Sequence, residues 1–367
     1  MTQRLLALYE QQGQSPWLDN LQRGYITSGQ LQELIASGIR GLTSNPTIFQ
    51  KAIQSSSDYD DQFVSEIKSG HKPEDAYWSL VISDIWGALD AFAPLYESSN
   101  GRDGFVSVEV DPWLAHNESD TLIAARSLDE RISRPNVMIK IPATSEGIPA
   151  IKQMIAEGRN VNVTLIFSLE RYRDVMNAYI EGLEMRLASG GDLTRVSSVA
   201  SFFISRVDTE IDRRLDAVGT PDALALRGTA AVNQAKLAYN MFEDLFSGQR
   251  WDRLAAAGAQ VQRPLWASTS TKNPAYPDTL YVDQLIGPQT VNTLPDTTVT
   301  AFADHGTVSR SIDVDVDTAH KQWKALGDLG VDVTDVAEQL EREGVSSFQK
   351  SFDELLTALR AKATDLS

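Results

Sequence analysis

Short segments rich in β-branched and apolar residues alternate with longer amphipathic segments along the chain, and this alternation constrains the fold more than any other feature. Strands that alternate with helices are typical of a parallel α/β sheet. Eight such strands favour a closed (β/α)8 TIM barrel over a doubly wound sheet, and no G-x-G-x-x-G sequence follows a strand as a dinucleotide fold requires. The expected strands are 17–19, 39–45, 105–110, 137–141, 161–166, 199–204, 265–269 and 297–302.

Helical segments are added to this barrel at two places. Residues 57–99 form a helical insertion between the second and third strands, and the chain from Thr318 onward has a helical pattern. Ser168 is expected to cap the helix over residues 169–188. Since no repeat and no linker interrupts the sequence, we expect residues 1–367 to form one α/β barrel domain with additional helices.

The composition excludes several classes of function. The 33 Lys and Arg against 50 Asp and Glu give a net charge of −17, which disfavours nucleic acid and anionic membranes as partners. The chain has no cysteine, which excludes thiol nucleophiles and Cys-ligated metals, and its four histidines lack ligand spacing, so no metal is expected. With neither a signal h-region nor a membrane-span pattern, the protein is expected to be cytoplasmic.

Polar side chains recur inside the central strands. In FVSVEV the valines share one face and Glu109 lies on the other, because side chains alternate along a strand. Lys140 in VMIKI alternates in the same way, as do Asn162 and Thr164 in VNVTLI. The apolar face of a barrel strand packs against the outer helices, so these polar residues are expected to line the lumen.

A lumen with this many polar groups is costly, because burying a charged group without a partner costs several kcal/mol. A single pair, such as Lys140 with Glu109 or Asp19, would be explained by a structural ion pair. Polar groups from at least five strands, with Asn45 among them, instead favour an active site, since barrel enzymes collect such residues from several strand ends. Trp17 and Trp266 are the tryptophans expected closest to this pocket.

Lys140 is the residue that suggests a chemistry. It is flanked by isoleucines, and a desolvated lysine loses its proton more readily and becomes a candidate imine-forming nucleophile. A carboxylate in direct contact would hold the proton on the amine, so Glu109 is expected one water away, as acid and base for carbinolamine dehydration. Asp19 is then the natural base for a substrate hydroxyl, which makes carbon–carbon bond chemistry on a carbonyl compound a coherent hypothesis.

Five segments in order resemble the transaldolase family of class I aldolase-type (β/α)8 enzymes. The opening WLDNLQR and the segment YVDQLIGPQTVNTLP resemble its longer bacterial branch. The five segments are GLTSNPTIF (41–49), VSVEVDPWLA (106–115), NVMIKIPAT (136–144), NVNVTLIFS (160–168) and SVASFFISRVD (198–208).

The resemblance implies a role for each residue of the site. Lys140 would form the Schiff base, Glu109 would act through water, and Asp19 would exchange the proton of the C4 hydroxyl. No cofactor and no metal would be needed, because the protonated imine is itself the electron sink. Phe203 would be the aromatic residue near the imine. The residues implied to position the dihydroxyacetone unit, the catalytic water or the substrate phosphate, or to support those that do, are Asn45, Thr164, Thr43, Asn162, Ser201 and Arg206.

One segment departs from the family pattern. Shorter members carry Ser-x-Arg after the seventh strand, whereas this chain reads STSTK at 268–272. Lys272 would then supply the second phosphate charge as a point charge rather than a fork. An exposed loop lysine with no such role is the alternative.

The implied reaction is the reversible transfer of a dihydroxyacetone unit between sugar phosphates in the non-oxidative pentose phosphate pathway. Sedoheptulose 7-phosphate and glyceraldehyde 3-phosphate would give erythrose 4-phosphate and fructose 6-phosphate. Two alternatives remain open. One is a lyase that releases dihydroxyacetone from fructose 6-phosphate, although Phe203 and Glu109 favour transfer because aldolase relatives carry Tyr and lack this carboxylate. The other is a non-catalytic sugar-phosphate-binding protein, for which a buried lysine would be unnecessary.

Overall fold

Eight parallel strands form a closed barrel, as the sequence predicts. The computed structural model describes residues 2–365, in which each strand pairs with the next and β8 pairs with β1. Every one of these pairings is parallel. The strands are β1 (Gln14–Leu18), β2 (Gly41–Thr43), β3 (Phe105–Glu109), β4 (Val137–Pro142), β5 (Val161–Ile166), β6 (Ser198–Phe203), β7 (Arg263–Ala267) and β8 (Thr290–Leu294).

The eighth strand is not the segment expected from the sequence. The expectation for residues 297–302 is wrong, because they lie in helix α15 (Asp296–His305), and the strand is β8 instead. β-branched residues prefer strands only weakly, and tertiary context overrides that preference. Pro295 is extended and Asp296 follows it in the first helical turn, where a carboxylate stabilises the helix N-terminus. β8 pairs with β1 along its whole length and so closes the barrel.

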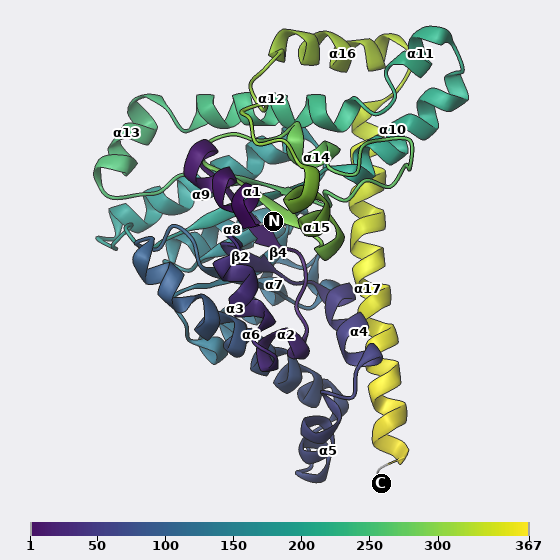
Figure 1. Cartoon of the computed structure of the whole chain (residues 1–367). Coiled ribbons are helices and arrows are strands. Elements are labelled where there is room, and N and C mark those ends of the chain that lie inside the picture. The colour runs from purple at the N-terminus through teal and green to yellow at the C-terminus, as the bar shows by residue number, and fades with distance from the viewer. Residues whose placement is uncertain (1, 366–367) are drawn as a thin grey trace.

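Helices surround the barrel on its outside (Figure 1). Most of them follow a strand and return the chain to the start of the next one, which parallel strands require. They are α1 (Thr2–Gln12), α2 (Arg23–Thr27), α3 (Gln30–Ala36), α4 (Pro46–Ser55), α7 (Glu118–Ile132), α8 (Gly147–Ala156), α9 (Leu169–Ala188), α10 (Ser205–Val218), α11 (Pro221–Ala225), α12 (Ala230–Leu245), α13 (Gly248–Ala256), α14 (Leu280–Asp283), α15, and a short 3-10 helix, η1 (Pro112–Leu114).

Both helical additions expected from the sequence are confirmed. Helices α5 (Asp60–Lys68) and α6 (Pro73–Ser98) lie between β2 and β3, and α16 (Val316–Asp328) and α17 (Val333–Asp365) follow α15. Figure 1 shows α17 in yellow as a long rod that passes α10 and α4 on the outside of the barrel. Its far end contacts α5, where Lys362 forms an ion pair with Asp60. Among residues 2–365, no helix has the length and apolar character needed to span a membrane.

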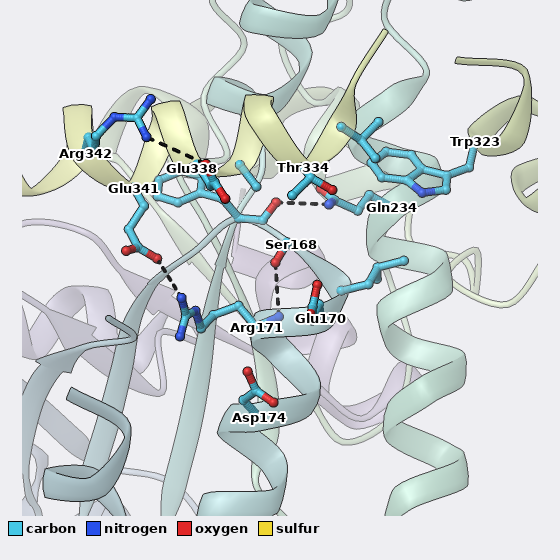
Figure 2. A pocket seen from close by; sticks show the side chains of 14 residues that line it. Ser168, Glu170, Arg171, Asp174, Gln234, Trp323, Thr334, Glu338, Glu341 and Arg342 are labelled. Carbon is cyan, nitrogen blue, oxygen red and sulfur yellow. Dashed lines mark hydrogen bonds and ion pairs between the residues drawn. The ribbon is translucent and has the colours of Figure 1, made fainter. Parts of the chain in front are cut away.

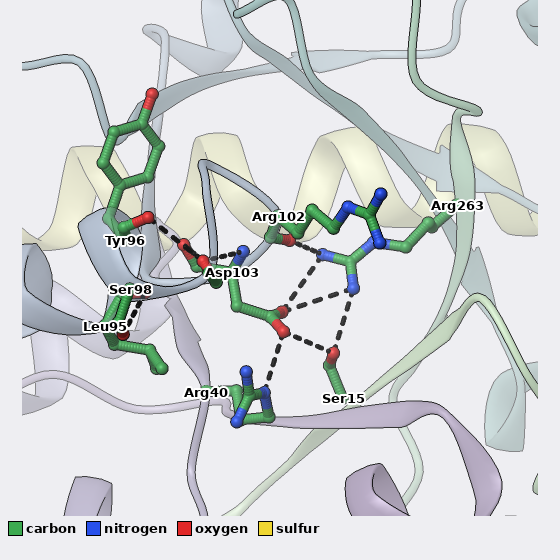
Figure 3. Close-up of polar contacts among 9 residues, drawn as sticks. Ser15, Arg40, Leu95, Tyr96, Ser98, Arg102, Asp103 and Arg263 are labelled. Atoms are coloured by element: carbon green, nitrogen blue, oxygen red, sulfur yellow. Dashed lines mark hydrogen bonds and ion pairs between the residues drawn. The ribbon is translucent and has the colours of Figure 1, made fainter. Parts of the chain in front are cut away.

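The N-terminal ends of the barrel strands are joined by a buried ion cluster (Figure 3). Asp103 precedes β3 and is fully buried; its carboxylate lies 2.8 Å from Arg40 Nε and 3.2 Å from Arg263 Nη2. Ser15 Oγ donates a hydrogen bond to the same carboxylate at 3.1 Å. Because Ser15 belongs to β1, Arg40 precedes β2 and Arg263 begins β7, one carboxylate connects four strands at this end of the barrel.

Candidate active site

A cavity of about 140 Å³ opens among the C-terminal ends of the strands and gathers most of the residues predicted from the sequence. The predicted residues that line it are Asp19, Thr43, Asn45, Lys140, Thr164, Ser201, Phe203, Arg206 and Lys272. Glu109 and Asn162 are buried directly beside these residues and contact them. The inward-facing positions of β1, β2, β4, β5 and β6 therefore converge on one site, which is the arrangement typical of barrel enzymes.

Two larger cavities contain none of these residues. One, of about 530 Å³, lies outside the barrel where α9 begins, and it is lined by Ser168, Arg171, Gln234, Trp323 and Glu341 among others (Figure 2). Ser168 caps α9 as expected, accepting a hydrogen bond from Arg171 N at 3.0 Å. The other, of about 550 Å³, lies near the Asp103 cluster. Size therefore does not identify the candidate active site; the convergence of polar side chains does.

Lys140 is buried at the centre of the site, with an exposed fraction of 4%. Its Nζ donates a hydrogen bond to Ser44 O at 2.9 Å and lies 3.2 Å from Glu109 Oε2. The expectation that Glu109 sits one water away is thus wrong, because the two side chains form a direct ion pair. Strand register explains the contact: Glu109 of β3 is paired with Lys140 of β4, so their side chains leave the sheet as neighbours.

Burial changes the pKa of the carboxyl group in this ion pair. Desolvation raises the pKa of the Glu109 carboxyl, and the positive charge of Lys140 opposes that rise without cancelling it. Neither carboxylate oxygen accepts a well-aligned hydrogen bond from residues 2–365. A carboxylate with a raised pKa is a better proton acceptor. Glu109 is therefore a candidate acid–base group in direct contact with the Lys140 amine.

Asp19, at the end of β1, lies on the opposite side of the cavity from β4 in the strand order and is held by hydroxyl groups. Thr43 Oγ1 donates to Asp19 Oδ1 at 2.8 Å, and Thr43 and Thr293 share a hydrogen bond of 2.7 Å. Burial raises the pKa of the Asp19 carboxyl, against the lowering effects of the Thr43 hydrogen bond and the charge of Lys140. Asp19 is therefore a second carboxyl group that can exchange a proton within the cavity.

Thr164 presents a free hydroxyl group to the cavity. Its Oγ1 is buried without a hydrogen-bond partner among residues 2–365, so a substrate hydroxyl or a water molecule would satisfy it. The pairing of β5 with β6 shifts register between Val163 and Ile166, and Leu165 has a φ of 59°. Such a bulge redirects side chains at a barrel rim, and here it falls at the strand end that carries Thr164.

Two amides have different places around the site. Asn45 lines the cavity and caps α4, accepting a hydrogen bond from Ile48 N at 3.0 Å through Oδ1, so its amide nitrogen remains available to a ligand. Asn162 is fully buried and does not line the cavity. It donates to Ser107 Oγ at 3.0 Å and accepts from Ser201 Oγ at 2.7 Å, so it positions Ser201 from below.

Two cations mark one side of the cavity. Arg206, at the start of α10, forms no hydrogen bond or ion pair within residues 2–365, and its guanidinium carbon lies 5.4 Å from the ring centroid of Phe203. Lys272 donates to Ser270 Oγ at 2.5 Å. Burial lowers the pKa of Lys272, and the charge of Arg206 lowers it further. Two cations beside one cavity create a locally positive region in a chain with a net charge of −17, and such a region favours an anion.

One wall of the cavity is not predicted from the sequence, and two tryptophans expected near the cavity lie outside its lining. Phe348 of α17 lines the cavity, and only the single glycine nearby, Gly344, signals a close approach of that helix. Trp17 and Trp266, the tryptophans expected closest to the pocket, do not line it. Trp17 is fully buried against Phe105, with ring centroids 6.4 Å apart, and Trp266 packs against Phe202.

Comparison with known proteins supports the resemblance seen in the sequence. The chain is 50% identical to Transaldolase 1 of Streptomyces avermitilis over 360 residues, which cover 96% of this chain and 95% of that protein. It is 51% identical to a transaldolase of Thermobifida fusca over 346 residues, 94% of both chains, and 48% identical to one of Mycolicibacterium smegmatis over 359 residues, 97% of both chains. Residues 16–359 match the transaldolase/fructose-6-phosphate aldolase family, and the chain therefore belongs to this family.

Proposed function

We propose that the protein is a transaldolase that moves a dihydroxyacetone unit between sugar phosphates through a Schiff base on Lys140. The donor would be sedoheptulose 7-phosphate or fructose 6-phosphate, and the acceptor glyceraldehyde 3-phosphate or erythrose 4-phosphate. One observation carries this proposal: Lys140, which forms an ion pair with the buried Glu109, lines the same cavity as the two cations Arg206 and Lys272. An amine for the carbonyl group and an anion site for the phosphate are the two features that this substrate class requires.

Imine formation would use Glu109 as the acid and base for the Lys140 amine. Glu109 takes the ammonium proton, and the neutral amine attacks the donor's C2 carbonyl carbon to give a carbinolamine. Glu109, whose pKa is raised by burial, then returns the proton to the leaving hydroxyl group, and water departs as the protonated imine forms. Thr164 and Asn45 are placed to hold the substrate hydroxyls, since both line the cavity with a polar atom available.

Carbon–carbon cleavage would depend on Asp19. Its carboxylate takes the proton of the C4 hydroxyl, the C3–C4 bond breaks, and its electrons pass to the imine to give an enamine on Lys140. The first aldehyde then leaves, and the enamine attacks the carbonyl carbon of the acceptor aldehyde while Asp19 returns the proton to the new hydroxyl group. Arg206, Lys272 and Ser201 would hold the phosphate of either aldehyde, and Phe203 would pack beside the imine.

A lyase that releases dihydroxyacetone is the second candidate, because the family also includes fructose-6-phosphate aldolase. Two residues favour transfer. Phe203 places a phenyl ring without a hydroxyl group in the cavity, and the Glu109 carboxylate contacts the reactive lysine. A coupled assay of product formation with and without an acceptor aldehyde separates the two. Acceptor-dependent turnover supports a transferase, and acceptor-independent release of dihydroxyacetone supports a lyase.

Reductive trapping tests the nucleophile. Borohydride added with fructose 6-phosphate is expected to fix a three-carbon adduct on Lys140, located by peptide mass spectrometry. Lys140→Ala is expected to abolish turnover and the adduct while the circular dichroism spectrum stays that of the native fold. Lys272, a second lysine of the same cavity, is the internal control, since it lies on the side of Arg206 and is not in contact with Glu109. An adduct on any lysine other than Lys140 would contradict the assignment.

A further inference from the structure

We infer that Phe348, on the last helix, controls whether the enzyme-bound three-carbon unit is transferred to an aldehyde or released by water. The inference rests on the proposed Schiff base at Lys140 and adds a specificity-determining residue to it. Phe348 lines the same cavity as Lys140, Thr164 and Arg206, with an exposed fraction of 4%. It is the cavity's contribution from α17, a helix that lies outside the barrel.

Contacts on both sides of the barrel mouth hold this part of α17 in place. Gly344 lies one turn before Phe348, and a Cβ at that position would come within 2.9 Å of Leu165 Cδ2, so the helix rests directly on the end of β5. One turn after Phe348, Ser351 and Thr47 of α4 share a hydrogen bond of 2.8 Å. The phenyl ring is therefore fixed between the strand that carries Thr164 and the helix that Asn45 caps.

The ring differs in kind from most of its neighbours in the cavity. The lining is largely made of hydroxyls, amides, carboxylates and cations, and a phenyl group offers none of these interactions to a sugar phosphate. The ring instead covers part of the cavity. With the ring in place the cavity measures about 140 Å³, below the ~300 Å³ at the lower end of small-molecule sites. Covering the reacting atoms excludes water from them and suppresses hydrolysis of reactive intermediates.

Water is the reactant that competes with transfer. After cleavage, the enamine on Lys140 either attacks an acceptor aldehyde or takes a proton on carbon to become the imine. In the second case the proton that Asp19 took from the C4 hydroxyl passes to the enamine carbon. A water oxygen then adds to the imine carbon, the C–N bond breaks, and the amine leaves with the proton as dihydroxyacetone is released. Water is the only further reactant. The ratio of the two outcomes is therefore set by how easily water reaches the imine carbon, which Phe348 restricts.

The test is the partition between these outcomes in Phe348→Ala. The assay uses fructose 6-phosphate and a saturating acceptor, and it measures the number of dihydroxyacetone molecules released for each transfer event. We expect this ratio to rise about tenfold, because water reaches the imine carbon more easily once the ring is removed. Phe348→Leu retains an apolar side chain of similar reach, and its partition should stay close to that of the parent enzyme. Leu355→Ala is the matched control, because it truncates a buried residue on the same helix that does not line the cavity.

Two results would overturn the inference. Either Phe348→Ala partitions like Leu355→Ala, or Phe348→Leu releases as much dihydroxyacetone as Phe348→Ala. Both results assume a parent enzyme that transfers the unit, so they leave the proposed function standing. A parent enzyme that forms no adduct on Lys140, or that turns over without an acceptor, would instead contradict the proposed function. If Phe348→Ala fails to fold, Phe348→Leu and Phe348→Val provide a graded series in which release should rise as the side chain shortens.

Discussion

At the scale of single residues, the direct Lys140–Glu109 contact is the point on which the chemistry depends. Period-two alternation predicts that both side chains face the lumen, but it cannot predict their separation, which the register between β3 and β4 determines. The same limit applies to Asn162. Its inward orientation follows from the sequence, whereas its position beneath Ser201 depends on depth along the barrel. Sequence therefore predicts which residues enter the lumen, and register decides which of them touch.

Glu109→Gln tests the acid–base role of the pair. The amide keeps the shape of the side chain but can neither take nor return the ammonium proton, so we expect imine formation to slow by about 100-fold, as for loss of a general acid–base group. The KM for fructose 6-phosphate should change much less. Rapid mixing followed by borohydride quenching measures the rate of adduct formation. A collapse in substrate affinity with an unchanged rate of adduct formation would contradict the role.

Arg206→Ala and Lys272→Ala test the anion site. A hydrogen bond to a charged group contributes about 1.5–3 kcal/mol, so Arg206→Ala should raise the KM for a phosphorylated donor by about 10- to 100-fold. A ketose without phosphate, such as fructose, should be affected little. Lys272→Ala should act in the same direction if Lys272 supplies the second charge. Steady-state kinetics on both donors provide the comparison. An equal rise in KM for both donors would contradict phosphate binding by these residues.

At the scale of elements, the sequence predicts seven of the strands because they are short, and most are dense in β-branched residues and bounded by helical signals. The prediction of the eighth strand is wrong for a specific reason. Residues 297–302 carry that density but follow Pro295 and Asp296, which start a helix, and β8 contains the more polar sequence TVNTL. The place of Phe348 in the cavity could not be predicted either, because it arises from a contact between residues about 180 positions apart, Gly344 and Leu165.

Asp208 joins three elements near the anion site and provides a pH test of their packing. This buried residue of α10 accepts hydrogen bonds from Ala231 N of α12 and Tyr281 Oη of α14, both at 2.7 Å. Burial nevertheless raises its pKa to about 6. A carboxyl with a raised pKa stabilises the fold below its unfolded pKa, and that contribution is lost as the pH rises through 6.

Asp208→Asn removes this titration while keeping the size of the side chain. The free energy of unfolding of the variant, relative to the parent protein, should therefore rise between pH 4 and pH 7.5. The gain should be about 2.5 kcal/mol, because about 1.4 kcal/mol is lost for each pH unit between pH 4 and the raised pKa of about 6. Urea denaturation at both pH values measures the difference. A relative stability independent of pH would contradict the raised pKa.

At the scale of the whole molecule, the Asp103 cluster joins β7 to the first three strands at one end of the barrel. Asp103→Asn removes the negative charge that compensates Arg40 and Arg263, and breaking a buried pair in this way costs about 3–5 kcal/mol. We expect the urea midpoint of the variant to fall accordingly. If the chain is one domain, as we propose, circular dichroism and tryptophan fluorescence should report coincident transitions in both proteins. Separate transitions would indicate independent units.

The position of the candidate active site has a kinetic consequence. The Asp103 cluster lies at the N-terminal ends of the strands, whereas the cavity with Arg206 and Lys272 opens among their C-terminal ends. Under the proposed function, the departing aldehyde and the incoming one would bind to the same two cations. The two aldehydes would then occupy the site in turn, and we expect ping-pong kinetics with competition between them.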